Sequence, residues 1–257
     1  AASDVYKRQT YTPDANYNGA DSFSFSVSDG EISDAASVSL VVNAVNDAPV
    51  LASVSDVSFD EDGSGSTSIS ASDVDGDDLD FSISGGTDIT ATLDGSSVSF
   101  SAPENFNGSE NFTVAVTDGT LSDSQIITVT VNAVNDAPVA TTGLSGTGDE
   151  DQSISVLLSG SDVDGDVLTY TITSSATNGS VEISGSNATY TPDANYNGVD
   201  SFSFSVSDGE ISDTATVGLS VNAVNDAPVL ASISDVSFDE DGSGSLSLSS
   251  SDVDSGD

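Results

Sequence analysis

The sequence lacks several of the side chains on which protein chemistry most often depends. Its 257 residues include no cysteine, histidine, methionine or tryptophan. Without cysteine there can be no disulfide and no thiol nucleophile, and without histidine no Ser–His–Asp triad and no imidazole metal ligand. The absence of cysteine also fits a protein exported by bacteria.

Positive charge is almost absent as well. Only Lys7 and Arg8 oppose 43 acidic side chains, and the formal net charge is −41. Contacts to phosphate groups need Lys and Arg, so a nucleic-acid partner and an anionic membrane surface are excluded. Since salt bridges cannot offset the acids, cations from solution or simple spacing in salty water must do so.

Other functional signatures are missing. No apolar run reaches the roughly 18 residues that a membrane-spanning helix needs, so we expect no membrane insertion. No phosphate-binding or dinucleotide fingerprint is present. Paired carboxylates could hydrolyse glycosides, but such pairs recur throughout this chain, whereas a catalytic pair belongs to one unique cleft. We therefore expect that the protein is not an enzyme.

The first nine residues stand apart from the rest. The segment Asp4-Val5-Tyr6-Lys7-Arg8-Gln9 resembles the in-frame translation of a transposon-end adapter used in preparing DNA libraries. On that interpretation residues 1–9 are a non-native leader and the natural sequence begins near Thr10. The alternative is that they are a genuine N-terminal segment.

A repeat organises the chain. The octapeptide Asn-Ala-Val-Asn-Asp-Ala-Pro-Val begins at Asn43, Asn132 and Asn222, at spacings of 89 and 90 residues. Residues 10–75 recur almost verbatim at 189–254. Because a fixed period fixes the domain count, we expect four segments. These are the C-terminal half of a repeat at 1–45, complete repeats at 46–134 and 135–224, and the N-terminal part of another at 225–257.

Alternation of apolar with polar residues predicts strands throughout the repeat at 46–134. The expected strands contain Val57 and Phe59; Ile69 and Ala71; Leu79, Phe81 and Ile83; Ile89, Ala91 and Leu93; Val98 and Phe100; Phe112, Val114 and Val116; and Ile127, Val129 and Val131. No stripe of helical period appears. Seven short strands in about 90 residues predict an all-β protein, a series of Greek-key β-sandwiches of immunoglobulin-like type placed end to end.

Successive strands reverse direction, so the loops alternate between the two ends of each sandwich. We call the end where the chain comes in the leading end and the end where it leaves the trailing end. The loop 73–77 and the turn 118–119 belong to the leading end. The segments 60–62, 104–108 and 132–136 belong to the trailing end. The acidic clusters therefore gather where one repeat follows another.

Aromatic residues could instead form a carbohydrate-binding face. Phe23 and Phe25, like Phe202 and Phe204, alternate with serine and are expected in the core. Tyr17, Phe106 and Tyr196 occupy one equivalent loop position and are expected to close the trailing end of each sandwich.

Acidic clusters of this kind suit a hard cation. Carboxylates, Asn amides and backbone carbonyls that converge without a base nearby are the ligands that calcium prefers. The simpler interpretation is that these residues only form solvated turns, for which Asp, Asn and Gly are ordinary choices. Several clusters per repeat, all near the junctions, favour calcium.

These motifs resemble those of the bacterial cadherin-like and tandem immunoglobulin-like repeats of large adhesins and other calcium-rich exported proteins. Asn46-Asp47-Ala48-Pro49 resembles the cadherin linker that ends in Asp-Asn-Ala-Pro. The loop 71–77 resembles the Asp-x-Asp loop of that family, and residues 116–119 its Asp-Gly turn. Phe59-Asp60-Glu61 stands where the family has an acidic residue at the end of the first strand. The resemblance covers essentially everything after Gln9.

The resemblance implies calcium between successive domains. At the middle junction the implied ligands are Asp60, Glu61 and Asp136 on one side and Asp162, Asp164 and Asp208 on the other. The equivalent residues elsewhere are Asp47, Asp73, Asp75 and Asp118, and Asp149, Glu150, Asp226, Asp252 and Asp254. The linker order Asn-Asp, and Asn at positions 43, 132 and 222 where an acidic ligand is common, depart from the family pattern and leave the number of ions open.

We therefore expect a calcium-stiffened structural spacer, the stalk of a large adhesin-like protein that is secreted or attached to a bacterial cell surface. Its expected partners are calcium ions and neighbouring repeats of the same chain, with polysaccharide or a cell-surface ligand bound by other domains. The alternative is that the repeats themselves bind polysaccharide or mediate homophilic adhesion between cells.

Overall fold

A computed structural model describes residues 8–254 of the chain. The expected leader at 1–9 therefore lies outside the described residues, except for its last two positions. The described chain is all-β, and no helix within it is long and apolar enough to span a bilayer. By its internal contacts the chain divides into two compact units, Ala1–Val134 and Asn135–Asp257.

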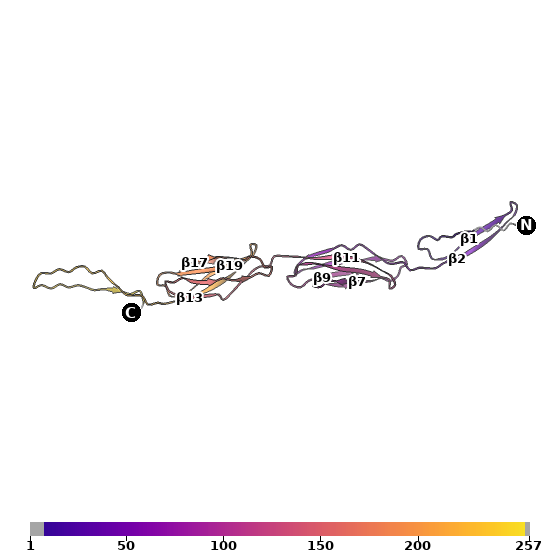
Figure 1. Cartoon of the computed structure of the whole chain (residues 1–257). Coiled ribbons are helices and arrows are strands. Elements are labelled where there is room, and N and C mark those ends of the chain that lie inside the picture. The colour runs from indigo at the N-terminus through magenta and orange to yellow at the C-terminus, as the bar shows by residue number, and fades with distance from the viewer. Residues whose placement is uncertain (1–7, 255–257) are drawn as a thin grey trace. The chain divides into compact units, whose positions relative to one another are not determined.

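In the first unit, a hairpin of two long strands precedes a complete sandwich (Figure 1). The strands are β1 (Gly19–Ser28), β2 (Ser33–Val42), β3 (Val50–Leu51), β4 (Val57–Asp60), β5 (Ser64–Ser68), β6 (Ala71–Ser72), β7 (Asp80–Gly85), β8 (Thr90–Asp94), β9 (Ser97–Ser101), β10 (Gly108–Thr117) and β11 (Ser122–Asn132). One layer has the order β4-β11-β10-β7. The facing layer has the order β5-β9-β8, with β3 paired to β6 beside it.

The second unit repeats this plan and adds a short pair at its end. Its strands are β12 (Val139–Ala140), β13 (Ser145–Asp149), β14 (Ile154–Leu157), β15 (Gly160–Ser161), β16 (Thr169–Ser174), β17 (Gly179–Ser184), β18 (Asn187–Pro192), β19 (Gly198–Ser207), β20 (Ser212–Asn222), β21 (Val229–Leu230) and β22 (Ser250–Ser251). The layers are β13-β20-β19-β16 and β14-β18-β17. The predicted Greek-key sandwich is therefore confirmed in both complete repeats.

The structure splits the first two predicted strands of each repeat. In the first unit, β3 pairs antiparallel with β6, whereas β4 crosses to the opposite layer and pairs parallel with β11. The second predicted strand is interrupted as well, because Ala71 lies on β6 whereas Ile69 lies between β5 and β6. The break follows from this change of partner, because one straight strand cannot pair within both layers.

Each complete repeat has its own core. Val98, Phe100, Phe112, Val114 and Val129 are almost fully buried in the first. In the second repeat, the almost fully buried residues include Tyr190, Phe202, Phe204, Val206 and Val217. The predicted plugs Phe106 and Tyr196 pack against these two cores.

The prediction of a core position is wrong for Phe23 and Phe25. These residues are 36% and 54% exposed, although their equivalents Phe202 and Phe204 are buried. The reason is that the described part of this segment contributes β1 and β2 alone, which pair with each other and face no second layer of described strands.

At the trailing end of each complete repeat, a group of polar residues joins the end of one strand to the end of the last strand, β4 to β11 in the first unit and β13 to β20 in the second. In the first unit, the Glu61 backbone N–H donates to the Asn132 carbonyl, and the Asn132 amide donates to Asp60. The Glu61 side chain accepts from the Val134 N–H at 2.5 Å. We call this group the clasp. Asp149, Glu150, Asn222 and Val224 form the same clasp in the second unit.

Candidate metal centres

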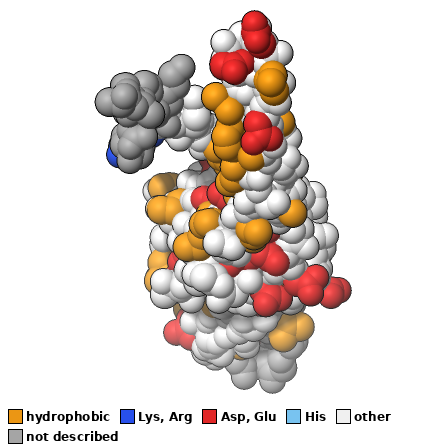
Figure 2. All heavy atoms as spheres, turned by 90° about the vertical axis from the view of Figure 1, so that its right-hand side faces the viewer, with side chains coloured by type: hydrophobic (Ala, Val, Ile, Leu, Met, Phe, Trp, Pro, Cys, Tyr) orange, Lys and Arg blue, Asp and Glu red, His pale blue; other side chains and the backbone are white. Residues whose placement is uncertain are grey.

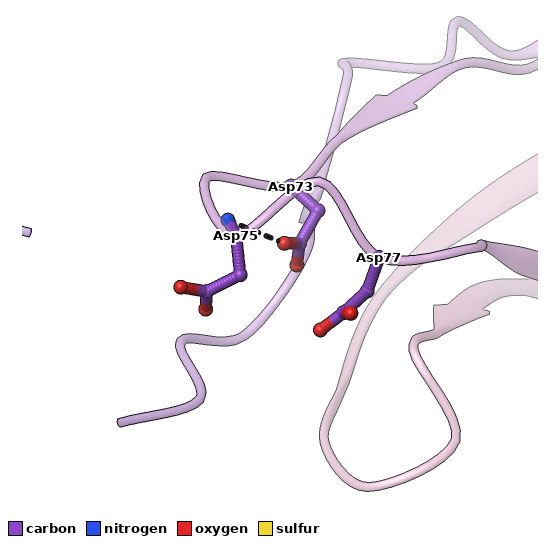
Figure 3. Close-up of side chains that lie close together, drawn as sticks. All are labelled: Asp73, Asp75 and Asp77. Carbon is purple, nitrogen blue, oxygen red and sulfur yellow. Dashed lines mark hydrogen bonds between the residues drawn. The ribbon is translucent and has the colours of Figure 1, made fainter. Parts of the chain in front are cut away.

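Three carboxylates converge at the leading end of the first complete repeat. Asp73, Asp75 and Asp77 lie on the loop between β6 and β7, and one oxygen from each comes within 4.8 Å of the others (Figure 3). The loop is held in this shape by Asp73, whose Oδ1 accepts from the N–H groups of Asp75 at 2.8 Å and Gly76 at 3.1 Å. Gly76 has φ +81°, a conformation that glycine adopts without strain.

The linker and the turn between β10 and β11 join this cluster. The Asp47 N–H donates to Asp75 Oδ2 at 2.8 Å, and the Asn46 amide donates to Asp118 Oδ2 at 2.9 Å. The other oxygen of Asp118 accepts from the N–H groups of Thr120 and Leu121. Residues 72 positions apart in sequence thus share one site.

The charges of this cluster act on one another. Partial desolvation and repulsion from Asp73 and Asp75 raise the pKa of Asp77. By contrast, the Leu121 N–H and the Asn46 amide lower the pKa of Asp118. Hydrogen-bond donors therefore favour the ionised form of Asp118, whereas Asp77 is repelled by its neighbouring carboxylates and no donor relieves that repulsion.

The second complete repeat reproduces this leading-end cluster. Asp162, Asp164 and Asp166 bring an oxygen each to within 4.8 Å of one another. The Asp136 N–H donates to Asp164 Oδ2 at 2.8 Å, and the Asn135 amide donates to Asp208 Oδ2 at 2.9 Å. That amide, followed by the Ile211 N–H, lowers the pKa of Asp208.

At the trailing end, the central acid is buried. Glu61 is 6% exposed and Glu150 is 4% exposed. One oxygen of each accepts a hydrogen bond from the clasp. The second oxygen of Glu150 accepts from Asn197 at 3.3 Å, whereas that of Glu61 is buried and has no hydrogen-bond partner.

Inside the second unit, Asp226 of the linker that follows β20 adds a further carboxylate near Glu150 at the trailing end. The Asp226 N–H donates to Asp254 Oδ2 at 2.6 Å, and the Asp254 N–H donates to Asp252. Burial, followed by repulsion from Asp254, Asp151 and Glu150, raises the pKa of Asp226. Acids of the trailing end (Asp151 and Glu150) and of the following repeat's leading end (Asp254) therefore both repel the carboxylate of Asp226.

The first unit holds a related cavity of about 270 Å³. Oxygen-bearing side chains from the first half-repeat and from the following linker and loop line it, together with a few apolar ones: Asp14, Asn16, Asn18, Asn43, Asp47, Asp75, Pro13, Tyr17, Val42 and Val45. Carboxylate and amide oxygens therefore converge around one space, in the way that a multi-oxygen cation site requires.

These centres fit a hard cation. Glu61 Oε2 and the Oδ2 atoms of Asp73, Asp162 and Asp226 are buried without a hydrogen-bond partner. A buried ionised oxygen is costly unless a donor or a cation neutralises it. Arg8 is the single basic side chain in the described part of the chain. Figure 2 shows carboxylates spread over the visible face among uncharged side chains. All the available ligand atoms are oxygens, which suits calcium.

The sequence identified most of these residues. Asp47, Asp73 and Asp75 come together at one leading end, where Asn46 links them to Asp118, and Asp136, Asp162 and Asp164 at the other, where Asn135 links them to Asp208. Asp60 and Glu61 share a trailing end, as do Asp149 and Glu150, and Asp226, Asp252 and Asp254 form the last cluster. Whether they bind calcium stays a prediction. The halves of the expected middle site, Asp60 and Glu61 on one side and Asp136, Asp162, Asp164 and Asp208 on the other, lie in different units.

The sequence analysis did not select several acidic residues that lie at the ends of the repeats. Asp77 and Asp166 belong to the three-acid clusters. Their signal was present in the Asp-x-Asp-x-Asp pattern of each loop. Asp62 and Asp151 adopt φ of +60° and +57° and accept from the N–H groups of Asn105 and Asn195. No local signal indicated these contacts, because the partners lie more than 40 positions away.

The sandwiches have the fold of immunoglobulin-like or cadherin-like domains, and comparison with known families agrees. Residues 46–131 and 135–220 both match the model of the bacterial Ig domain, and residues 3–43 match that of the cadherin-like domain. The chain belongs to the bacterial Ig domain family. No curated protein matches the sequence.

Similar solved structures include cadherins and an enzyme. Human protocadherin-24 EC1-2 is 16% identical, with 70% of this chain and 100% of that chain covered and a TM-score of 0.45. Mouse protocadherin-24 EC1-3 is 15% identical, with 82% of this chain and 81% of that chain covered and a TM-score of 0.48. An endo-fucoidan hydrolase of glycoside hydrolase family 107 is 23% identical over 83% of this chain, at a TM-score of 0.31. The chain spans 35% of that hydrolase.

Proposed function

We propose that the chain is a non-catalytic, calcium-stiffened spacer of a larger exported bacterial protein. In this role the tandem sandwiches hold other domains away from the cell, and calcium ions bind the acidic ends of the repeats. Domains of the bacterial Ig and cadherin-like families are typically extracellular, which supports a location outside the cell.

The observation that carries the proposal is the set of buried carboxylate oxygens without donors. The Oδ2 atoms of Asp73 and Asp162 recur at equivalent positions of the two leading ends, and Asp226 in the last linker adds another such oxygen. A catalytic site would need a unique constellation, whereas a spacer asks the same of every copy. The same oxygens repeated in successive repeats therefore favour a structural cation.

Stiffening follows from electrostatics. Without a cation, carboxylates of the trailing end and of the following linker repel one another, as the raised pKa of Asp226 indicates. Domains joined by short linkers move freely unless their contact is extensive. A cation shared by both sides would replace this repulsion with attraction and restrict the motion.

Small-angle X-ray scattering of the whole chain tests this role. With millimolar calcium we expect a larger maximum dimension and a stiffer particle than with chelator. Magnesium at the same concentration is the control for ionic strength, because it retains its water and prefers strict octahedral geometry. An unchanged scattering profile in calcium would contradict the proposal.

A further inference from the structure

An Asn-Gly pair closes a trailing-end loop in each repeat that contains this region. The pairs are Asn18-Gly19, Asn107-Gly108 and Asn197-Gly198. In each case the motif is Asn, an aromatic residue, Asn and Gly, and the glycine is the first residue of β1, β10 or β19. The pair is therefore a feature of the repeat rather than of one copy.

The glycine of each pair is required by the backbone. Gly19, Gly108 and Gly198 have φ of +127°, +152° and +133°, a region that residues with a side chain rarely adopt. At Gly198, a Cβ atom would also lie 3.3 Å from the hydroxyl oxygen of Tyr196. An asparagine at this position is therefore followed by glycine as long as the fold is kept.

The asparagine of the pair lies among the carboxylates of the candidate metal centres. The Asn197 amide donates to Oε2 of the buried Glu150 at 3.3 Å. Asn18 lines the cavity of about 270 Å³ together with Asp47 and Asp75. A neutral amide thus stands where one more carboxylate would add to an oxygen-rich site.

An asparagine followed by glycine rearranges in water. The glycine nitrogen attacks Cγ of the asparagine, the bond from Cγ to Nδ2 breaks, and ammonia leaves with the proton of the glycine N–H. Water then opens the resulting succinimide at one of its two C–N bonds, which gives aspartate or isoaspartate. Glycine permits the ring closure because no Cβ atom shields its nitrogen. The reaction needs only water, and it replaces a neutral amide with a carboxylate.

We infer that Asn18, Asn107 and Asn197 are deamidation sites, at which a carboxylate is added to the trailing-end centres as the protein ages and cation binding is thereby strengthened. Asparagine is among the chemically labile residues of proteins, and the affinity of a calcium site depends on the number of its charged ligands. The gain of affinity rests on the proposed function. The conversion itself follows from the dipeptide and its backbone.

The first test uses controls that the chain already contains. Asn132 and Asn222 also lie at trailing ends and donate their amides to the aspartates of the clasp, but alanine follows each of them. The whole folded chain is incubated in chelator at neutral pH, and peptide mapping by mass spectrometry follows each asparagine. We expect Asn107 and Asn197 to convert about tenfold faster or more, a difference of about 1.4 kcal/mol in the barrier. Equal rates at the two kinds of site would overturn the inference.

The second test measures what the new carboxylate does. N197D is the aspartate product of the reaction in the second unit. We expect it to bind calcium roughly tenfold more tightly than the natural chain, because a charged ligand replaces an amide. N111D adds the same charge at an exposed position of β10 and is the matched control. Isothermal titration compares the three proteins, and equal affinities of N197D and N111D would overturn the inference.

The aged natural chain gives the same answer without a substitution. Its calcium affinity should rise with the extent of conversion that mass spectrometry measures. Conversion without any gain of affinity would overturn the link between deamidation and the cation. If neither fresh nor aged chain binds calcium, the proposed function fails together with that link, while the rates at the Asn-Gly pairs still decide whether these residues are modified.

Discussion

At the residue scale, the carboxylates fall into two groups according to their donors. Glu110 accepts from the N–H groups of Thr87, Asp88 and Ile89, and Asp213 accepts from that of Ala140. These donors lower the pKa of both carboxyls. Asp73 and Asp226 instead each have a buried oxygen with no donor. The first group stabilises loops through hydrogen bonds, whereas the second group is where we propose that a cation binds.

Glu110 offers a test of the first group. Replacing it with alanine should lower the free energy of unfolding at pH 7 by about 1–3 kcal/mol, because three loop N–H groups lose a charged acceptor. The lower value is the more realistic one, since the carboxylate is only half-buried and solvent screens it. E110Q, which keeps an acceptor oxygen, should lose less, and E182A, on exposed strand β17, should lose least. Chemical denaturation measures all four proteins.

The pH dependence of this effect has a definite sign. Because the pKa of Glu110 is lowered by folding, its contribution is present above the unfolded value of about 4.3 and is lost as pH falls through the folded value. The stability difference between natural protein and E110A should therefore shrink below about pH 4.3. A difference that stays constant down to pH 3 would contradict this assignment.

At this scale, sequence reasoning predicted acidic clusters whose members are neighbours in the chain, but it missed contacts between residues that are distant in the chain. The spacing of Asp73 and Asp75 was sufficient to predict a cluster. The roles of Asn46 and Glu110 were not predictable, because their partners Asp118 and Thr87 are brought close by the sandwich itself. An isolated Glu on a strand carries no mark that it caps a loop.

At the element scale, alternation of apolar and polar residues predicted each strand but not where strands change layer. Val57 and Phe59 were correctly placed on one strand. The break between β3 and β4 depends on partners far along the chain, β6 and β11. Local pattern contains the period of a strand, but not the identity of its neighbour.

The loop between β15 and β16 allows a test of the proposed ligands. D162N keeps an oxygen that can accept from Asp164 and Asp166 but removes the charge. We expect calcium affinity of the second repeat to fall about tenfold or more, while stability in chelator stays constant or rises because repulsion is relieved. E182Q removes one charge from β17 and is the matched control. Isothermal titration with calcium measures both variants, and equal affinities would remove Asp162 from the site.

At the scale of the whole molecule, calcium should add stability as well as stiffness. A cation bound only by the folded state contributes RT ln(1 + [L]/Kd) per site. For dissociation constants of roughly 0.1–1 mM, typical of extracellular modules, each site would add about 2.7 to 1.4 kcal/mol at about 10 mM calcium. The thermal midpoint should therefore rise in the millimolar range. Melts from micromolar to 10 mM calcium check this, and saturation at micromolar calcium would contradict it.

Whether a repeat is complete also determines whether its apolar side chains are buried. The sequence of β1 is almost that of β19, yet its phenylalanines are exposed where those of β19 are buried. The alternating pattern correctly marks which face is apolar. In a complete repeat the second layer buries that face, whereas no strand that the structure describes faces β1 and β2.

The parallel pairing of β4 with β11 has a mechanical consequence. β4 lies near the start of the repeat and β11 is its last strand, and the two lie side by side and run in the same direction. Tension applied between Asn46 and Val134 would pull them in opposite senses along their common axis. The hydrogen bonds between them would then bear the load together, in shear, rather than opening one after another. The clasp at Glu61 lies where that load leaves the repeat. Each sandwich is thus arranged to transmit a pull along the chain without coming apart first at its edge.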